Sequence, residues 1–316
     1  MGYLYALLAA LLFGMNGSVT RVVMEAGLTA AQLTLFRVAT AAVIAAVYLL
    51  IANRSAFRIS RRQFAILAVL GVLGVAMLQF TYAVAISLLP IGIALLLEYL
   101  AVLLVALLAF FIFKEKVKPR LWIAIGCVLV GLAFVAQIWA SELNPLGVAF
   151  ALLAATMLTL YFVVGEREVG KTSPMAVAFW TMSFATVFWL IFGGWWEIDP
   201  AIFTETVSLS GNLNGILVPF WVPLHWNTVL GSFAPFFLSL VALKYLSATA
   251  AGVVASSEVL FAFLVAWLWL GEGLGPLQMV GAAIVLAGIV LAQTARVNKV
   301  VDANLALSDS PEQSLA

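Results

Sequence analysis

Residues 91–113 read IGIALLLEYLAVLLVALLAFFIF, and residues 250–270 read AAGVVASSEVLFAFLVAWLWL. Each stretch is apolar over the roughly 20 residues that a membrane-spanning helix needs, and each contains one carboxylate, Glu98 or Glu258. A charged group inside a span is costly, so it usually faces the protein interior or a water-filled cavity and marks a functional site. We therefore take the two glutamates as the first candidate site residues.

An internal repeat relates the two stretches. An offset of 160 residues, the difference between 98 and 258, aligns residues of the first half with identical residues of the second. Such pairs are Leu70 and Leu230, Gly71 and Gly231, Gly92 and Gly252, and Glu98 and Glu258. Nearer the amino terminus, residues 6–10 and 151–155 both read ALLAA. The change in offset indicates loops of unequal length in two homologous halves, residues 1–140 and 141–296.

The composition is that of a polytopic membrane protein. Hydrophobic residues make up 65% of the 316 residues and charged residues 9%, whereas a soluble domain has about half and about a quarter. With a net charge of +1, the expected partners are the lipid bilayer and a small-molecule substrate, not nucleic acid. A single cysteine, Cys127, and a single histidine, His225, build neither a disulfide nor a metal cluster, so we expect no metal and no cofactor.

Apolar runs of about 20 residues predict ten spanning helices and an all-α integral membrane fold. The predicted spans are residues 2–24, 30–51, 63–87, 91–113, 121–140, 145–165, 174–194, 226–246, 250–271 and 276–296. The first span follows Met1 without a basic leader, so we expect it to be retained. Residues 297–316 are polar and lack apolar periodicity, which predicts a disordered cytoplasmic tail.

The basic residues predict the orientation, because Lys and Arg concentrate in cytoplasmic loops. All of them except Arg21 and Arg37 fall on one side if the spans alternate. This set is Arg54, Arg58, Arg61, Arg62, Lys114, Lys116, Lys118, Arg120, Arg167, Lys171, Lys244, Arg296 and Lys299. The protein is therefore expected in the inner (plasma) membrane with both termini in the cytoplasm. The long connection 195–225 is expected outside.

Each half has five predicted spans, which is an odd number. The second half therefore enters the membrane from the side opposite to the first. Inverted repeats of this kind place a substrate site near the membrane midplane, at the interface between the halves. Arg37 in the second span lies at nearly the depth of Glu98, and a buried charge favours a partner. We therefore expect an Arg37–Glu98 ion pair.

Further candidate site residues are polar or aromatic side chains at depth. They are Asn16, Tyr161, Gln79, Ser239, Tyr82 and Trp180, together with Ser257 next to Glu258. For any one of them, interhelical hydrogen bonding or packing is the alternative interpretation. Pro235 predicts a kink in the eighth span, and Glu115 and Glu272 are expected to be junction residues between helices.

Glu258 differs from Glu98 in its expected surroundings. Residues 179–182, which align with Arg37 and its neighbours, read FWTM, so the second half has no matching arginine. A carboxyl in apolar surroundings without a positive partner favours its neutral form. This predicts that Glu258 couples transport to protons or binds a substrate amine, with Ser256 or Ser257 orienting it.

Short motifs carry a resemblance to a known family. Residues 12–16 read LFGMN, 36–37 FR, 97–101 LEYLA and 113–116 FKEK, and the second half repeats part of this as SSEVL at 256–260. From about Tyr3 to Gln293 the chain resembles the EamA-like permeases of the drug/metabolite transporter superfamily. The chain departs from that pattern where Tyr99-Leu100-Ala101 replaces a proline shortly after the glutamate, and in its long loop after the seventh span.

The resemblance implies two inverted repeats of five helices in a bacterial inner membrane and the movement of small metabolites or drugs, often as efflux. A secondary transporter working by alternating access is the function that follows, with export and proton coupling as the favoured form. A facilitative uptake or exchange permease without proton coupling stays open as an alternative, as does a homodimer. An enzyme is disfavoured because no nucleophile with a base is in evidence, and a channel because two glutamates form no ring of ligands.

The predicted topology can be checked by cysteine labelling in a Cys127→Ala background. Cysteines placed at Ser60 and Lys118 should react only from the cytoplasmic side, and one at Ser210 only from outside, because the basic loops stay in the cytoplasm. Labelling of both Ser60→Cys and Ser210→Cys by one membrane-impermeant reagent in intact cells would contradict the span count and the inversion.

Overall fold

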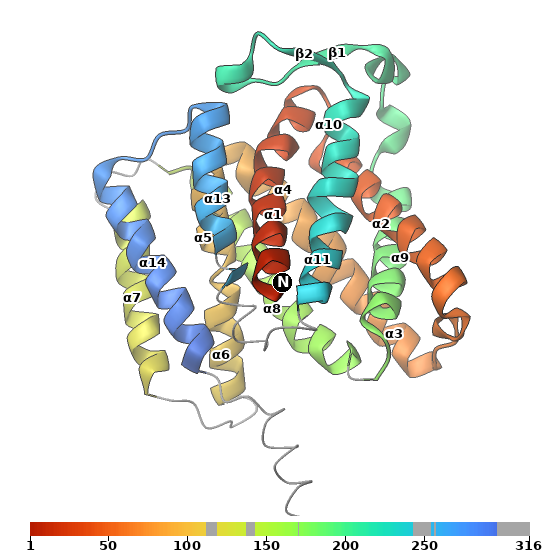
Figure 1. The fold of residues 1–316 in the computed structure, drawn as a ribbon, viewed down its shortest axis with the longest axis horizontal. Helices are drawn as coiled ribbons and strands as arrows, with labels where there is room; N and C mark the ends of the chain where they lie inside the picture. Colours follow the sequence, from red (N-terminus) through yellow and green to blue (C-terminus); the bar gives the residue numbers. More distant parts are fainter. Residues whose placement is uncertain (112–118, 137–142, 170, 243–253, 256, 296–316) are drawn as a thin grey trace, which may run out of the picture.

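The computed structural model describes residues 1–111, 119–136, 143–169, 171–242, 254–255 and 257–295 (Figure 1). Several predicted features lie outside these ranges. They are the tail 297–316, the basic residues Lys114, Lys116, Lys118, Lys244 and Arg296, the junction residue Glu115, and Ser256. All ten predicted spans contain helix within the described ranges.

The first half is built from helices that follow one another with short connections. They are α1 (Gly2–Glu25), α2 (Ala30–Ala52), α3 (Arg61–Val69), the π-helix η2 (Leu70–Met77), α4 (Leu78–Leu88), α5 (Ile91–Glu98), α6 (Ala101–Phe111) and α7 (Arg120–Ala136). Segments α3, η2 and α4 form one continuous helical rod, whereas α5 and α6 are separated at Tyr99 and Leu100.

The second half repeats this order and adds a small hairpin. Its elements are α8 (Pro145–Val169), α9 (Pro174–Phe192), β1 (Thr206–Ser208), β2 (Leu217–Pro219), α10 (Trp221–His225), the π-helix η6 (Trp226–Phe233), α11 (Ala234–Ala242), α13 (Ser257–Val265), the π-helix η7 (Ala266–Leu270) and α14 (Pro276–Ala295). Within the described ranges, five helices are long and apolar enough to cross a membrane. The helical membrane fold is therefore confirmed, and the full count of ten spans stays a prediction.

Local sequence signals define where several helices begin. Thr29 and Gln32 form a capping box at the start of α2, and the side chains of Ser60 and Ser173 accept backbone hydrogen bonds at the starts of α3 and α9. The Asn144 side chain accepts from the amide of Leu146 at 2.9 Å at the start of α8. These side chains satisfy amides that have no partner within the helix.

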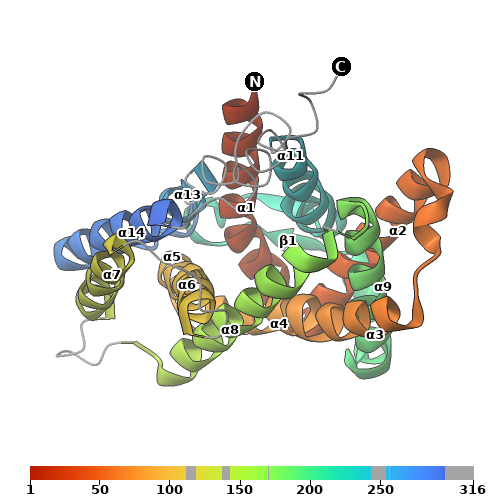
Figure 2. The ribbon, with the colours of Figure 1, turned by 90° about the horizontal axis from the view of Figure 1, so that it is seen from below.

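Helices α2 and α9, which are equivalent in the two halves, pack side by side in opposite directions. At one end the Gln32 side chain of α2 donates to the carbonyl of Gly194, just after α9, at 2.9 Å. At the other end Leu49, late in α2, packs in one cluster with Ala176, early in α9. Figure 2 shows this pair on one side of the molecule.

Helices α7 and α14 form a second antiparallel pair on the opposite side (Figure 2). The Gln278 side chain, near the start of α14, donates to the carbonyl of Val135, near the end of α7, at 3.3 Å. Midway, the two helices meet at glycines, because a methyl group on Gly131 would lie 2.8 Å from the carbonyl oxygen of Gly281. Small residues allow this close backbone approach.

Helices α5 and α13 form the third antiparallel pair, between the other two. Gly92, early in α5, packs against the ring of Phe263, late in α13. Tyr99, just after α5, reaches Glu258, early in α13. Because all three equivalent pairs run antiparallel, the contacts are those of two repeats related by inversion.

Helical irregularities occur at equivalent places in the two halves. The π-helix η6 begins at Trp226, which the 160-residue offset aligns with residue 66, so η6 and η2 overlap in the repeat. Wide helical turns are found preferentially at functional sites. Pro235 is the second residue of α11, two positions after the end of η6, and its missing amide leaves the turn before it without one regular α-helical hydrogen bond. The predicted kink residue thus lies at a true irregularity.

The connection 195–219 covers one end of the bundle, here called the hairpin end (top of Figure 1). Strands β1 and β2 pair antiparallel, with Val207 opposite Val218. The indole of Trp269 donates to the carbonyl of Leu209 at 2.6 Å, and the Asn212 side chain donates to the carbonyl of Leu268 at 3.1 Å. These contacts dock the connection on η7.

The glycine contact between α7 and α14 generates a prediction. Gly281→Ala should lower the melting temperature in detergent, because the new methyl would lie 2.7 Å from the Gly131 carbonyl oxygen and overpacking costs about 1–3 kcal/mol. Gly126→Ala is the matched control on α7, since nothing lies within 4 Å of its methyl position. Equal melting temperatures for both variants would contradict this close packing.

Candidate functional site

A cavity of about 440 Å³ lies between the two halves. Eight of the predicted site residues line it. They are Asn16, Arg37, Gln79, Tyr82, Glu98, Tyr161, Ser239 and Glu258. The two repeats therefore bring together polar side chains from α1, α2, α4, α5, α8, α11 and α13, which lie far apart in the sequence.

The cavity reaches from mid-bundle toward the end opposite the hairpin. On α1 its lining runs from Ala6 to Asn16, and on α2 from Arg37 to Ala45. Met175, the second residue of α9, also lines it. Because α1 ends and α2 begins at the hairpin end, the cavity occupies the half of the bundle away from the hairpin.

Glu258 receives a hydrogen bond from the other repeat. Helix α13 begins at Ser257 and carries Glu258 in its first turn, while α5 ends at Glu98 with Tyr99 next in the chain. The Tyr99 hydroxyl donates to Glu258 Oε2 at 2.6 Å. Tyr99 is not among the predicted site residues, although its place next to Glu98 in the sequence was a usable signal.

Arg37 is buried, with 8% of its surface exposed, and it contacts a serine instead of the predicted carboxylate. Its Nε donates to Ser232 Oγ at 2.9 Å, and that hydroxyl donates to the carbonyl of Asn227 at 2.9 Å. Among the described residues the ion pairs are Arg21–Glu272 and Lys171–Glu168, so the expected Arg37–Glu98 pair is not formed.

The physical reason is the packing of α2 against η6. The second half delivers Ser232 to the guanidinium of Arg37, so that Nε is satisfied by a neutral hydroxyl. Within the described part of the chain, the two terminal nitrogens of Arg37 make no hydrogen bond, and Arg37 lines the cavity. These nitrogens form a planar donor pair of the kind that binds carboxylates.

A buried amide network anchors η6 on α1. Asn227 Nδ2 donates to Asn16 Oδ1 at 2.9 Å and to Thr20 Oγ1 at 2.8 Å. Gly231 packs directly against the Asn16 side chain, where any side chain at position 231 would collide with it. Sequence reasoning selected Asn16 and missed Asn227, Thr20 and Ser232. The polar residues in the WNTVLGS stretch at 226–232 were the available signal.

Two acceptor oxygens of cavity-lining residues have no donor among the described residues. They are Glu98 Oε2 and Gln79 Oε1, both shielded from solvent. A buried acceptor without a donor is costly. As a lining residue Glu98 gives the cavity a group that complements a cation, while Arg37 complements an anion.

Two predicted site residues lie elsewhere. Trp180 Nε1 donates to the carbonyl of Ala56 at 3.2 Å, and its ring stacks on Phe184 with centroids 5.9 Å apart. Ser257 Oγ donates to the carbonyl of Val254, three residues earlier in the chain, at 2.6 Å. Neither side chain lines the cavity.

Comparisons with known proteins agree with this architecture. The EamA-like transporter family matches residues 1–137 and 145–294, that is, each repeat once. An "uncharacterized transporter" of Archaeoglobus fulgidus is 25% identical over 224 residues, which cover 70% of this chain and 75% of that one.

The threonine/homoserine exporter RhtA of Escherichia coli K12 is 26% identical over 212 residues, which cover 66% of this chain and 65% of the exporter. A solved crystal structure superposes with a TM-score of 0.61 at 16% identity, over 93% of this chain and 98% of that one. At this low identity the structural likeness concerns the fold alone.

The Arg37–Ser232 contact generates a prediction. Ser232→Ala should lower the free energy of unfolding by about 1–3 kcal/mol, because it leaves the buried Nε of Arg37 without an acceptor. Ser257→Ala is the matched control, since that hydroxyl bonds a backbone carbonyl three residues earlier in the chain. Thermal unfolding of both variants in detergent measures the difference. A Ser232→Ala protein as stable as the control would show that the serine does not hold Arg37.

Proposed function

Because this chain belongs to the EamA-like transporter family, we propose that it exports small zwitterionic metabolites, amino acids foremost, across the bacterial inner membrane. The chain is a multi-pass membrane transporter. We propose its substrate class, the direction of transport and the coupling of transport to protons. The observation that carries it is the cavity between inverted repeats, which holds one arginine and two carboxylates at mid-bundle.

The charges of the cavity support a substrate with one anionic and one cationic group. The two terminal nitrogens of Arg37 are suited to a bidentate contact with a carboxylate. Glu98 lines the same cavity, and its carboxylate suits an ammonium group. The name of the relative RhtA, a threonine/homoserine exporter, points to substrates that carry both groups.

Proton coupling is assigned to Glu258. Its carboxyl lines the cavity and has the Tyr99 hydroxyl as its hydrogen-bond donor at 2.6 Å, with no ion pair to a described residue. Apolar surroundings favour the neutral form of the Glu258 carboxyl, and the hydrogen bond from Tyr99 favours its anion. A small change in these surroundings, when substrate binds or when the cavity opens to either side, would therefore make Glu258 bind or release a proton. The substrate would then leave the cell in exchange for a proton that enters it.

Alternating access is supported by the antiparallel pairing of equivalent helices. Inverted repeats transport by rocking one part of the bundle against the other around a site at their interface. The basic residues assign both termini and the end opposite the hairpin to the cytoplasm. The cavity extends toward that end, so this conformation would receive substrate from the cytoplasm.

The test is transport by purified protein in vesicles, with a panel of labelled compounds. Threonine, homoserine and other zwitterions should be transported against their gradient when a pH gradient is imposed. Matched compounds that lack either the amine or the carboxylate should be transported at least about tenfold less well, because each lost charged contact is worth about 1.5–3 kcal/mol. Transport of one-charge compounds at the zwitterion rate would contradict the assigned substrate class.

Coupling is tested in the same vesicles with Glu258→Gln. Gradient-driven accumulation should disappear, because the amide cannot carry a proton, while substrate exchange without a gradient survives. Glu205→Gln in the exposed connection 195–219 is the matched control and should behave as the wild type. If Glu258→Gln accumulates substrate at the wild-type rate, another group couples transport to protons and Glu258 is a cavity residue only. If the wild type itself does not accumulate substrate under the pH gradient, the protein works as an exchange or facilitative permease.

A further inference from the structure

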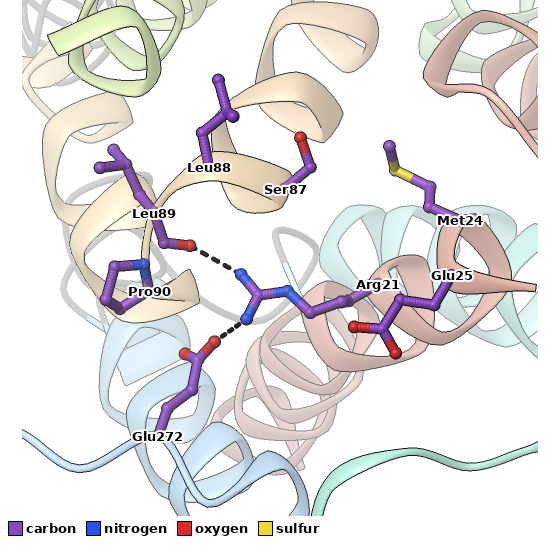
Figure 3. Close-up of a pocket in the computed structure, with 8 residues that line it drawn as sticks. All are labelled: Arg21, Met24, Glu25, Ser87, Leu88, Leu89, Pro90 and Glu272. Atoms are coloured by element: carbon purple, nitrogen blue, oxygen red, sulfur yellow. Dashed lines mark hydrogen bonds and ion pairs between the residues drawn. The ribbon is translucent and has the colours of Figure 1, made fainter. Parts of the chain in front are cut away.

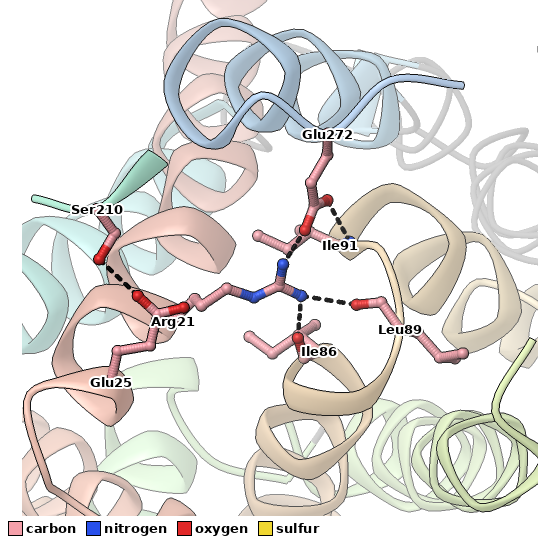
Figure 4. Close-up of polar contacts among 7 residues, drawn as sticks. All are labelled: Arg21, Glu25, Ile86, Leu89, Ile91, Ser210 and Glu272. Atoms are coloured by element: carbon pink, nitrogen blue, oxygen red, sulfur yellow. Dashed lines mark hydrogen bonds and ion pairs between the residues drawn. The ribbon is translucent and has the colours of Figure 1, made fainter. Parts of the chain in front are cut away.

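Arg21, one of the two arginines that do not follow the basic-loop pattern, lies near the hairpin end of α1 and connects three segments (Figures 3 and 4). Its Nη1 forms an ion pair with Glu272, which follows η7 in the second half. Its Nη2 donates to the carbonyls of Ile86 and Leu89, the latter at 2.6 Å. Glu272 Oε2 in turn accepts from the amide of Ile91 at 2.9 Å.

These contacts cap two helix ends at once. Ile86 and Leu89 lie at the end of α4, where the last carbonyls have no partner within the helix, and a cation is favourable there. Ile91 is the first residue of α5, where free amides and the helix dipole favour an anion. Arg21 and Glu272 therefore hold the α4–α5 turn from both sides. We call this group, Arg21, Glu272 and the backbone of 86–91, the Arg21 latch.

The latch connects directly to the site. Helix α5 begins at Ile91 and ends at Glu98, so fixing its first residue restrains the helix that carries the carboxylate. Ile91 also packs on Gly17 of α1, where a methyl group would lie 2.6 Å from its Cγ2. Separating α5 from α1 at the hairpin end would break the ion pair, expose both helix ends and open this contact.

The turn packs against Gly147 of α8 through Leu88 and Leu89 and borders open space on another side. A surface cavity of about 520 Å³ borders Arg21, Ser87, Leu88 and Pro90 (Figure 3). Close by, Ser210 in the connection 195–219 donates to the Glu25 carboxylate (Figure 4). The side chains of Arg21 and Glu272 keep 18% and 17% exposure, so salt on the hairpin side can still reach and weaken their ion pair.

We propose that the Arg21 latch is the outer gate of the transporter: it closes the hairpin end in the conformation whose cavity extends to the opposite end, and its rupture is the step that opens the site outward. This inference rests on the proposed transport by alternating access. It makes Arg21 and Glu272 gating residues that contact no substrate, and it gives α1 the role of holding the α4–α5 turn to the η7–α14 junction.

The test places a reporter cysteine at Ile91, whose side chain is fully buried and packs on Gly17 of α1, in the Cys127→Ala background. In vesicles of known orientation, a membrane-impermeant thiol reagent on the hairpin side should label Ile91→Cys slowly. Adding Arg21→Met, which keeps side-chain bulk but removes the charge and the caps, should raise the labelling rate about tenfold or more, as expected for a shifted two-state equilibrium.

Glu272→Gln is the second variant, because its amide oxygen still accepts from Ile91 while the ion pair is lost, and it should accelerate labelling less than Arg21→Met. Arg54→Met is the matched control, since Arg54 also bonds a helix-end carbonyl, that of Leu50 at 2.9 Å, but at the opposite end. Wild-type labelling rates in both latch variants, with melting temperatures near the wild type, would overturn the gate.

A second measurement serves if Arg21→Met folds poorly. Raising the salt concentration on the hairpin side screens a partly exposed ion pair, so labelling of Ile91→Cys in the otherwise unchanged chain should accelerate, whereas a salt-independent rate would count against the latch. Labelling needs no substrate and no pH gradient. If the transport assay fails but the labelling rate still depends on the latch, the proposed substrate or coupling is wrong and the proposed gate is still supported.

Discussion

Charged groups buried in an apolar bundle are the constraint on which this structure depends. Arg37, Glu98 and Glu258 lie where a charge without partners would be costly. The structure surrounds each of the three with different polar groups. A serine from the other half holds Arg37, a tyrosine from the other half holds Glu258, and Glu98 faces the cavity with an oxygen that has no donor among the described residues. The site exists because the two halves supply each other's hydrogen-bond partners.

Packing between equivalent helices makes that exchange possible. Glycines at the α7–α14 contact and the Gly92–Phe263 contact bring antiparallel backbones together, while the π-helices η2 and η6 lie beside the cavity. The α2–α9 and α7–α14 pairs lie at the sides of the bundle, and the helices with π-turns lie beside the cavity at its centre. The Arg21 latch acts on that centre, because it caps the helix that carries Glu98.

Much of the fold and the cavity could be predicted because membrane sequences carry strong signals. Apolar runs locate the helices, and the repeated glutamates locate the interface. Polar residues at depth, such as Asn16, Gln79 and Tyr161, are rare enough that most of them do line the cavity. The prediction was wrong for Trp180, because aromatic side chains are common in spans and pack at many places. It was wrong for Ser257, because a serine hydroxyl can bond a backbone carbonyl close to it in the chain.

The sequence by itself determined that the chain is a membrane protein of two homologous halves and which charges lie deep, because hydrophobicity, repeats and depth are properties of chain position. Only the tertiary structure decided the partners. Ser232 instead of Glu98 contacts Arg37, Tyr99 contacts Glu258, and Glu272 pairs with Arg21 across 251 positions of the chain. Such choices depend on the rotation of each helix about its axis and on its register against neighbours, which the packing of all helices sets together and no single segment encodes.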